Sequence, residues 1–110
     1  MKRSVVFLGL SMILSSVALA QSVDTAAAEA LIKSNKCTKC HSIDKDKAGV
    51  PGYKKIAAKY KGKADAQAKL YTHLTTGPKV KVDGEEEEHV KIKAKDDAAI
   101  KNLIGFILSR

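Results

Sequence analysis

The clearest repeat of hydrophobic positions lies near the C-terminus of the chain. Apolar side chains from Ile100 to Leu108 recur at the three- and four-residue intervals of a helix that buries one face. Asp96 and Asp97 stand just before this stripe, where carboxylates interact favourably with the positive end of a helix dipole. We therefore predict a terminal helix whose apolar side packs into the core.

Three further helices are predicted upstream. The first has Asp24 as its N-terminal cap and several alanines as strong helix formers, and it ends before Cys37. The second covers residues 53–60. The third begins at Asp65 and ends at Gly77, where the following proline cannot continue it.

Two segments between these helices are expected to be irregular. Residues 42–52 are rich in Asp, Lys and Gly and close with Pro51-Gly52, which is typical of a loop. Residues 79–94 are also expected to lack regular structure, with a turn at Asp83-Gly84. The sequence thus predicts an all-α fold, a small helical bundle without repeats or low-complexity linkers.

The first twenty residues have the composition of a secretory signal peptide. A positively charged start precedes a short apolar run, residues 5–14, and the small-residue cleavage site Ala18-Leu19-Ala20. The run is too short for a stable membrane anchor, which is the alternative interpretation. We expect residues 1–20 to be a signal peptide and residues 21–110 to be one domain exported to the periplasm.

The exported part of the chain is basic. Without Lys2 and Arg3, 18 of the 20 basic residues remain against 12 acidic ones, which gives a formal charge of +6. Aromatic residues are too few for a base-stacking surface, so nucleic acid is not expected as a partner. Acidic patches on redox proteins fit this charge better. The basic surface is expected to include Lys36, Lys39, Lys54, Lys55 and Lys59.

One short motif contains the residues that can bind a cofactor. Cys37 and Cys40 are separated by two residues and followed directly by His41, which is the signature of covalent haem attachment. The two thiols would form thioethers with the haem vinyl groups, and His41 would be the proximal iron ligand. A domain of this size has a small core and usually needs a disulfide, a metal or another bound group for stability, and one covalent haem c would provide this.

Two other uses of a cysteine pair fit less well. A structural zinc site needs about four ligands, and the chain has no second Cys or His pair at metal-binding spacing. A thioredoxin-like redox pair belongs to a βαβ pattern, whereas this sequence predicts helices. Haem attachment behind an export signal is therefore the favoured interpretation.

The whole exported part resembles the small bacterial class I cytochromes c. Residues 51–63 are similar to that family's Pro-x-Tyr-Lys-x-x-Ala-x-Lys-Tyr segment, and residues 95–97 resemble the start of its terminal helix, with Phe106 as its usual aromatic residue. The resemblance implies a bundle whose first and last helices cross beside the haem. It also implies that the Pro51 carbonyl accepts a hydrogen bond from His41 and orients the ring.

The sequence departs from that family at the sixth iron ligand. The family uses methionine, but the only methionines, Met1 and Met12, lie in the predicted signal peptide. Counting back from Phe106, the resemblance places the ligand position on His89, whose imidazole is a good iron ligand. His73 is expected near the haem rim or in solvent. A lysine (Lys79, Lys81 or Lys91) or an open iron site remains the alternative.

The surroundings of His89 also differ from the family. Glu85 to Glu88 precede it in place of the family's proline-rich loop, and the family's tryptophan near the haem propionates is absent. Four adjacent carboxylates are most often a solvated stretch. If His89 binds iron, they lie near its distal face and favour ferric iron.

These features predict a periplasmic one-electron carrier with one covalent haem c, bis-histidine ligation and a low potential. A haem protein that binds or senses a small ligand is the second hypothesis, and it needs an open or displaceable sixth position. A dedicated haem subunit of an oxidoreductase complex is the third. The chain has no second polar constellation that would activate a substrate, so an enzyme is not expected.

The motif predicts haem that resists denaturation. Haem staining should follow the polypeptide on a denaturing gel, because thioether bonds survive unfolding. Cys37→Ala or Cys40→Ala should sharply lower the yield of holoprotein, since the sequence offers no other covalent or metal link to stabilise the fold. Haem that washes off under denaturation would contradict the prediction.

Overall fold

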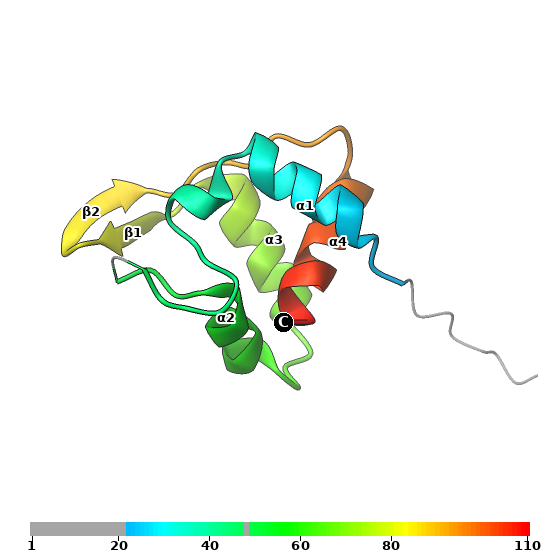
Figure 1. Ribbon diagram of the computed structural model, residues 1–110, viewed down its shortest axis with the longest axis horizontal. Coiled ribbons are helices and arrows are strands. Elements are labelled where there is room, and N and C mark those ends of the chain that lie inside the picture. Colours follow the sequence, from blue (N-terminus) through cyan, green and yellow to red (C-terminus); the bar gives the residue numbers. More distant parts are fainter. Residues whose placement is uncertain (1–21, 48) are drawn as a thin grey trace, which may run out of the picture.

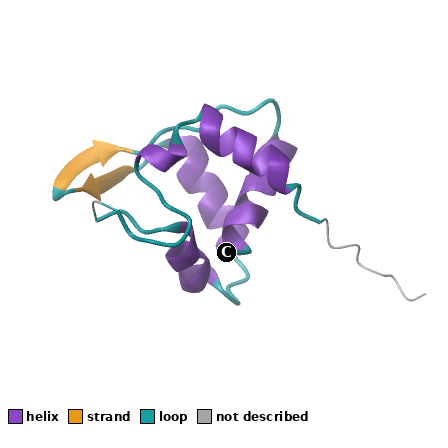
Figure 2. Cartoon of the chain, viewed as in Figure 1, coloured by secondary structure: helices purple, strands orange, loops and turns teal. Residues whose placement is uncertain are grey.

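A computed structural model describes residues 22–47 and 49–110 of the chain. The predicted signal peptide, residues 1–20, lies outside the described residues. The four predicted helices are confirmed, and Figures 1 and 2 show them packed together with a small hairpin at one side. The elements are α1 (Thr25–Ser34), the short 3-10 helix η1 (Cys37–Lys39), α2 (Tyr53–Tyr60), α3 (Ala66–Thr76), β1 (Lys79–Val82), β2 (Glu85–Glu88) and α4 (Asp97–Leu108).

The helix ends are set largely by the residues that the sequence indicated. The side chain of Asp24 accepts a hydrogen bond from the backbone N–H of Ala27 at 3.0 Å and so caps α1. Asp96 caps α4 in the same way, through the N–H of Ala99 at 2.9 Å. Asp65 occupies the cap position of α3, but its carboxylate pairs with Lys69 instead.

The core is built around α4. Its side chains Leu103, Ile104 and Phe106 are almost completely buried, and α4 contacts α1, α2 and α3. Ala28 and Ile32 on α1 pack against the same apolar stripe. Burial of one large apolar side chain contributes about 1.5–3 kcal/mol, so this stripe holds the three other helices in place.

Two asparagine side chains tie α1 to later parts of the chain. Asn102 on α4 accepts from the N–H of Asp24 and donates to its carbonyl oxygen, each at 2.8 Å. Asn35 donates to the carbonyl of Lys93 at 3.1 Å and accepts from its N–H at 2.8 Å. Both ends of α1 are therefore anchored, including the end that leads into the cysteine motif.

The expectation that residues 79–94 are irregular was wrong for the first ten of them. Lys79–Val82 and Glu85–Glu88 form an antiparallel hairpin, with Lys79 opposite Glu88 and Val82 opposite Glu85. The predicted turn at Asp83-Gly84 is confirmed, and both residues have positive φ, as two-residue hairpin turns require. Sequence patterning missed the hairpin because a strand of four exposed glutamates has no apolar face and glutamate is depleted in strands. The predicted helical bundle is confirmed, and the hairpin adds a small two-stranded sheet to it.

Within the described residues, no helix combines the length and the hydrophobicity that a membrane crossing needs.

Candidate haem site

A cavity of about 640 Å³ opens between α2, α3, the hairpin and the loop that follows the cysteine motif. Its volume falls within the roughly 300–1,000 Å³ that is usual for cofactor pockets. Much of its wall is apolar and includes Ile56 on α2, Leu70 and Leu74 on α3 and Leu103 on α4. The helices thus leave an apolar space at the point where the sequence places its chemistry.

The cysteine motif reaches this cavity through a tight turn after α1. Lys36 has left-handed backbone geometry, with φ of 54°, and the short helix η1 follows. The N–H of His41 donates to the carbonyl of Cys37 at 2.9 Å, which closes one turn. Cys37 and His41 line the cavity, whereas Cys40 is half-buried and is not among the residues that line it.

His41 is held in a defined orientation. Its Nδ1 donates to the carbonyl oxygen of Pro51 at 2.8 Å, so the implied hydrogen bond is confirmed. The ring stacks on Tyr53 with 5.4 Å between the centroids. Burial lowers the pKa of His41, while the Pro51 carbonyl opposes that change and His89 adds to it. A neutral ring with its Nδ1 occupied offers Nε2 as the metal-binding atom.

The loop after the motif fixes the Pro51 carbonyl. The carboxylate of Asp46 accepts from the N–H of Gly52 at 3.0 Å and from the ammonium of Lys55 at 2.9 Å. A Cβ on Gly52 would lie 2.6 Å from the carbonyl oxygen of Lys45, so only glycine fits there. Backbone packing and one ion pair therefore hold the proximal side in shape.

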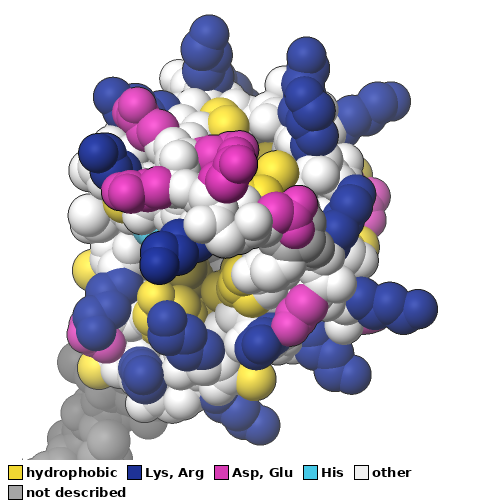
Figure 3. Space-filling model, turned by 90° about the vertical axis from the view of Figure 1, so that its left-hand side faces the viewer, with side chains coloured by type: hydrophobic (Ala, Val, Ile, Leu, Met, Phe, Trp, Pro, Cys, Tyr) yellow, Lys and Arg dark blue, Asp and Glu magenta, His cyan; other side chains and the backbone are white. Residues whose placement is uncertain are grey.

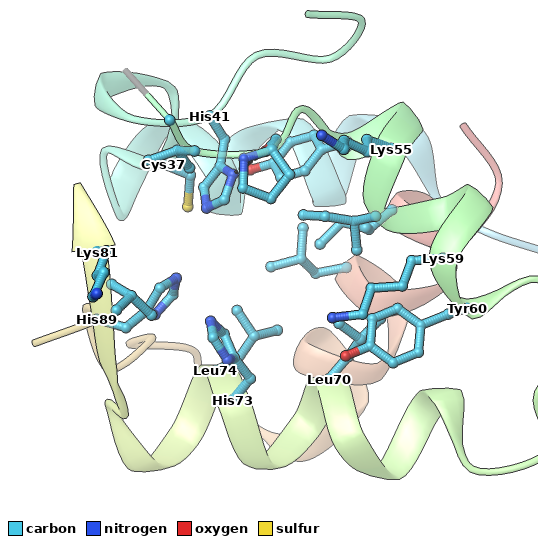
Figure 4. A pocket seen from close by; sticks show the side chains of 18 residues that line it. Cys37, His41, Lys55, Lys59, Tyr60, Leu70, His73, Leu74, Lys81 and His89 are labelled. Atoms are coloured by element: carbon cyan, nitrogen blue, oxygen red, sulfur yellow. Dashed lines mark hydrogen bonds between the residues drawn. The ribbon is translucent and has the colours of Figure 1, made fainter. Parts of the chain in front are cut away.

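His89 enters the cavity from the side opposite His41, as Figure 4 shows. It is the first residue after β2, and its ring centroid lies 6.1 Å from that of His41. Its Nδ1 donates to the carbonyl of Val90 at 2.9 Å, which leaves Nε2 for another partner. Two imidazoles that each bind one metal ion at about 2 Å have their centroids about 6 Å apart.

His73 lies closer to this site than the sequence indicated. It projects from α3 into the cavity, half-buried, with its centroid 4.4 Å from that of His89 in an edge-to-face contact. Burial is the main cause that lowers its pKa, and the two other histidines add to the effect. Helical spacing alone gave no signal that this face of α3 meets the end of the hairpin.

Sequence reasoning also missed the role of Tyr53 in the wall of the site. The residue is buried, stacks on His41, and belongs to the apolar cluster against which Cys37 packs. Burial raises the pKa of Tyr53 far above its usual range, and the pKa of Cys37 is raised for the same reason. The position of Tyr53 in the Pro-x-Tyr segment was the one signal that could have identified it.

Lysines surround the mouth of the cavity, but some of the lysines that the sequence predicted for this surface lie elsewhere. Figure 3 shows lysine and arginine side chains spread around a hollow with hydrophobic atoms at its floor. Lys55, Lys59 and Lys81 line the cavity. Lys54 instead faces a separate shallow depression beside the C-terminal end of α4. Lys36 and Lys39 are exposed next to the motif.

The chain belongs to the cytochrome c family. The family match, described as cytochrome c, covers residues 25–110. The fold is that of a class I cytochrome c, mostly helical with a small sheet. This family binds one covalent haem c. The two thiols and the imidazole of the motif are the donors that such a group needs, and the apolar cavity that Cys37 and His41 line has the volume of a cofactor pocket.

Among solved structures, the chain is similar to the class 1 cytochrome MtoD from Sideroxydans lithotrophicus ES-1. The two are 56% identical, with 80% of this chain and 97% of that one covered and a TM-score of 0.75. Cytochrome c552 of Nitrosomonas europaea is 30% identical, over 74% of this chain and 96% of that one, with a TM-score of 0.59. Cytochrome c-551 of Pseudomonas aeruginosa is 38% identical over 68 residues. That match spans 62% of this chain and 64% of the relative, slightly under two thirds of its length.

The loop around Asp46 generates a prediction about acid stability. The Lys55 ammonium and the Gly52 N–H lower the pKa of this carboxylate in the folded protein. It therefore stabilises the fold above the unfolded pKa of about 3.9, and that contribution is lost as the pH falls through the lower folded pKa. Asp46→Asn should reduce resistance to urea at pH 7, and the difference from the unmodified holoprotein should disappear in acid.

The matched control is Asp44→Asn, which changes an exposed carboxylate of the same loop. The structure describes no hydrogen bond or ion pair for Asp44. Its urea midpoint should change little at either pH. A loss at pH 7 that is equal in the two variants would show that the Asp46 contacts contribute nothing specific.

Proposed function

We propose that this chain is a periplasmic carrier of single electrons. Its relatives are small cytochromes c, and the pattern of residues 1–20 supports export. Cys37 and Cys40 would hold the haem by thioether bonds, and His41 would be its proximal ligand. Haem, when bound, supplies a one-electron ferric/ferrous couple. The protein provides the ligands, the apolar cavity and the surface for partners.

The observation that carries the proposal is the placement of His41 and His89. Their rings enter one cavity from opposite sides with 6.1 Å between the centroids, which is the spacing expected of two axial imidazoles. Each ring has its Nδ1 bonded to a backbone carbonyl, so each presents Nε2. We therefore propose bis-histidine ligation by His41 and His89.

Other distal ligands have less support. His73 lines the cavity, but its ring packs edge-to-face against the ring of His89, with 4.4 Å between the centroids. Lys81 also lines the cavity, whereas Lys79 and Lys91 are exposed and do not. The imidazoles of His73 and His89, both on the distal side, favour a sixth iron position that is closed to other ligands. This supports a carrier over a sensor that needs an open site.

A low reduction potential follows from the proposed ligands. Axial methionine raises the potential of cytochromes c, whereas imidazole is the stronger donor and favours ferric iron. Changes of axial ligand move haem potentials over a range of about 0.8 V, so this exchange should outweigh other influences. The exposed carboxylates Glu85 to Glu88 act in the same direction, but solvent screens them.

The ligand assignment is tested by His89→Ala, with His73→Ala as the matched control. Both variants remove an imidazole from the distal side of the cavity. His89→Ala should convert the low-spin optical spectrum to high-spin and open the ferrous protein to carbon monoxide. His73→Ala should stay low-spin, and His89→Met should raise the midpoint potential. An unchanged spectrum and potential in His89→Ala would remove His89 as the ligand, and a high-spin His73→Ala would assign the role to His73.

The lysines at the mouth of the cavity predict electrostatic steering. Ferricyanide, an anionic oxidant, should react more slowly as salt rises, because the Debye length falls to about 10 Å at 0.1 M. The cationic reagent hexaammineruthenium should show the opposite trend. Lys59→Gln/Lys81→Gln should flatten the ferricyanide salt dependence, whereas Lys101→Gln on α4 should not. Stopped-flow rates that ignore ionic strength would contradict steering by these residues.

A further inference from the structure

The backbone that carries His89 lies directly against the C-terminal end of α3. The N–H of His89 donates to the carbonyl of Pro78 at 2.8 Å, and the N–H of Ile92 donates to the carbonyl of Leu74 at 2.8 Å. The hairpin ladder ends one residue before His89, at the pair Lys79–Glu88. The position of the imidazole is therefore set by how closely this backbone approaches the helix end.

Gly77 allows that approach. It is the C-terminal cap of α3, buried, with a left-handed φ of 62°. A Cβ at this position would lie 2.8 Å from the carbonyl oxygen of His89 and 3.0 Å from the nearest side-chain carbon of Lys91. The lysine side chain is flexible and can move aside. The His89 carbonyl belongs to the backbone, so relief of that contact requires the segment that carries His89 to move.

We propose that Gly77 is a positioning residue for His89, because its missing side chain lets the backbone of His89 sit where the imidazole faces His41. This inference rests on the proposed ligation by His41 and His89. Gly77 itself does not line the cavity. It acts through the His89 main chain, which one hydrogen bond holds to Pro78 just after α3, while Ile92 is bonded to Leu74 in the last turn of that helix.

The chain provides a control that separates this contact from backbone strain. Gly62, after α2, also has a left-handed φ, 74°, but a Cβ there would meet no described atom within 4 Å. Alanine at either position must adopt a conformation that L-residues disfavour. Only at Gly77 does the new side chain also press on the His89 segment.

The experiment compares purified holoproteins of Gly77→Ala and Gly62→Ala. Changes next to a metal ligand typically cost 10–100-fold in metal affinity, so ferrous Gly77→Ala should bind carbon monoxide about tenfold or more tightly than the unmodified protein. Its low-spin optical signature should weaken. Gly62→Ala should lose thermal stability but keep the spectrum and the carbon monoxide affinity of the unmodified protein. Equal carbon monoxide binding in the two variants would overturn the inference.

Gly77→Asn and Gly62→Asn form a second pair. Asparagine tolerates left-handed geometry better than alanine, so this pair reduces the strain and retains the Cβ contact. Gly77→Asn should still bind carbon monoxide more tightly than Gly62→Asn. Failure of both Gly77 variants to accumulate as holoprotein, while both Gly62 variants do, would also overturn the inference, because a positioning role predicts a folded protein with a displaced ligand.

His89→Ala distinguishes failure of this inference from failure of the proposed function. If His89→Ala opens the iron site while Gly77→Ala behaves like Gly62→Ala, the ligation stands and the positioning role is wrong. If His89→Ala leaves the low-spin spectrum unchanged, the ligation is wrong and the positioning role is overturned with it.

Discussion

The hydrogen bond from His41 to the Pro51 carbonyl links the parts of this molecule that build the site. It joins the turn after α1 to the loop before α2, and its 2.8 Å length leaves little freedom to the ring. Asp46 holds that loop through Gly52 and Lys55, so an exposed ion pair supports a half-buried imidazole. The bond also selects the tautomer, because a carbonyl oxygen accepts only from a protonated Nδ1. The proximal geometry is thus set by the polypeptide itself.

The rest of the fold holds a cavity open beside this bond. The apolar stripe of α4 packs against the three other helices. The side chains of Asn102 and Asn35 anchor the two ends of α1 through paired hydrogen bonds to backbone groups. Two side chains of the stripe, Leu103 and Ile107, form part of the cavity wall. A small domain gains stability when an apolar cofactor fills such a space.

The distal side is built differently, since it depends on the hairpin of β1 and β2. Methionine is absent from residues 21–110, and a polar hairpin stands before His89. The hairpin gains order from its tight turn and from lysines opposite glutamates, with little apolar burial. Its base is tied to the end of α3, which brings His89 and His73 into contact. The N–H of His89 is bonded to the Pro78 carbonyl, and the His89 carbonyl lies close to Gly77, so main-chain contacts hold this side of the cavity.

The sequence by itself determined the four helices, their caps and the haem motif, because helical periodicity, capping residues and the Cys-x-x-Cys-His spacing are local signals. The resemblance to a family added the His41–Pro51 bond and pointed to His89. Only the tertiary structure decided that His73 reaches the same cavity, that Lys54 faces away from it, and that Gly77 contacts the His89 backbone. The first and third facts depend on how α3 and the end of the hairpin meet, and the second depends on how α2 packs beside α4. No local pattern encodes that meeting, since β2, with its four exposed glutamates, has no apolar face.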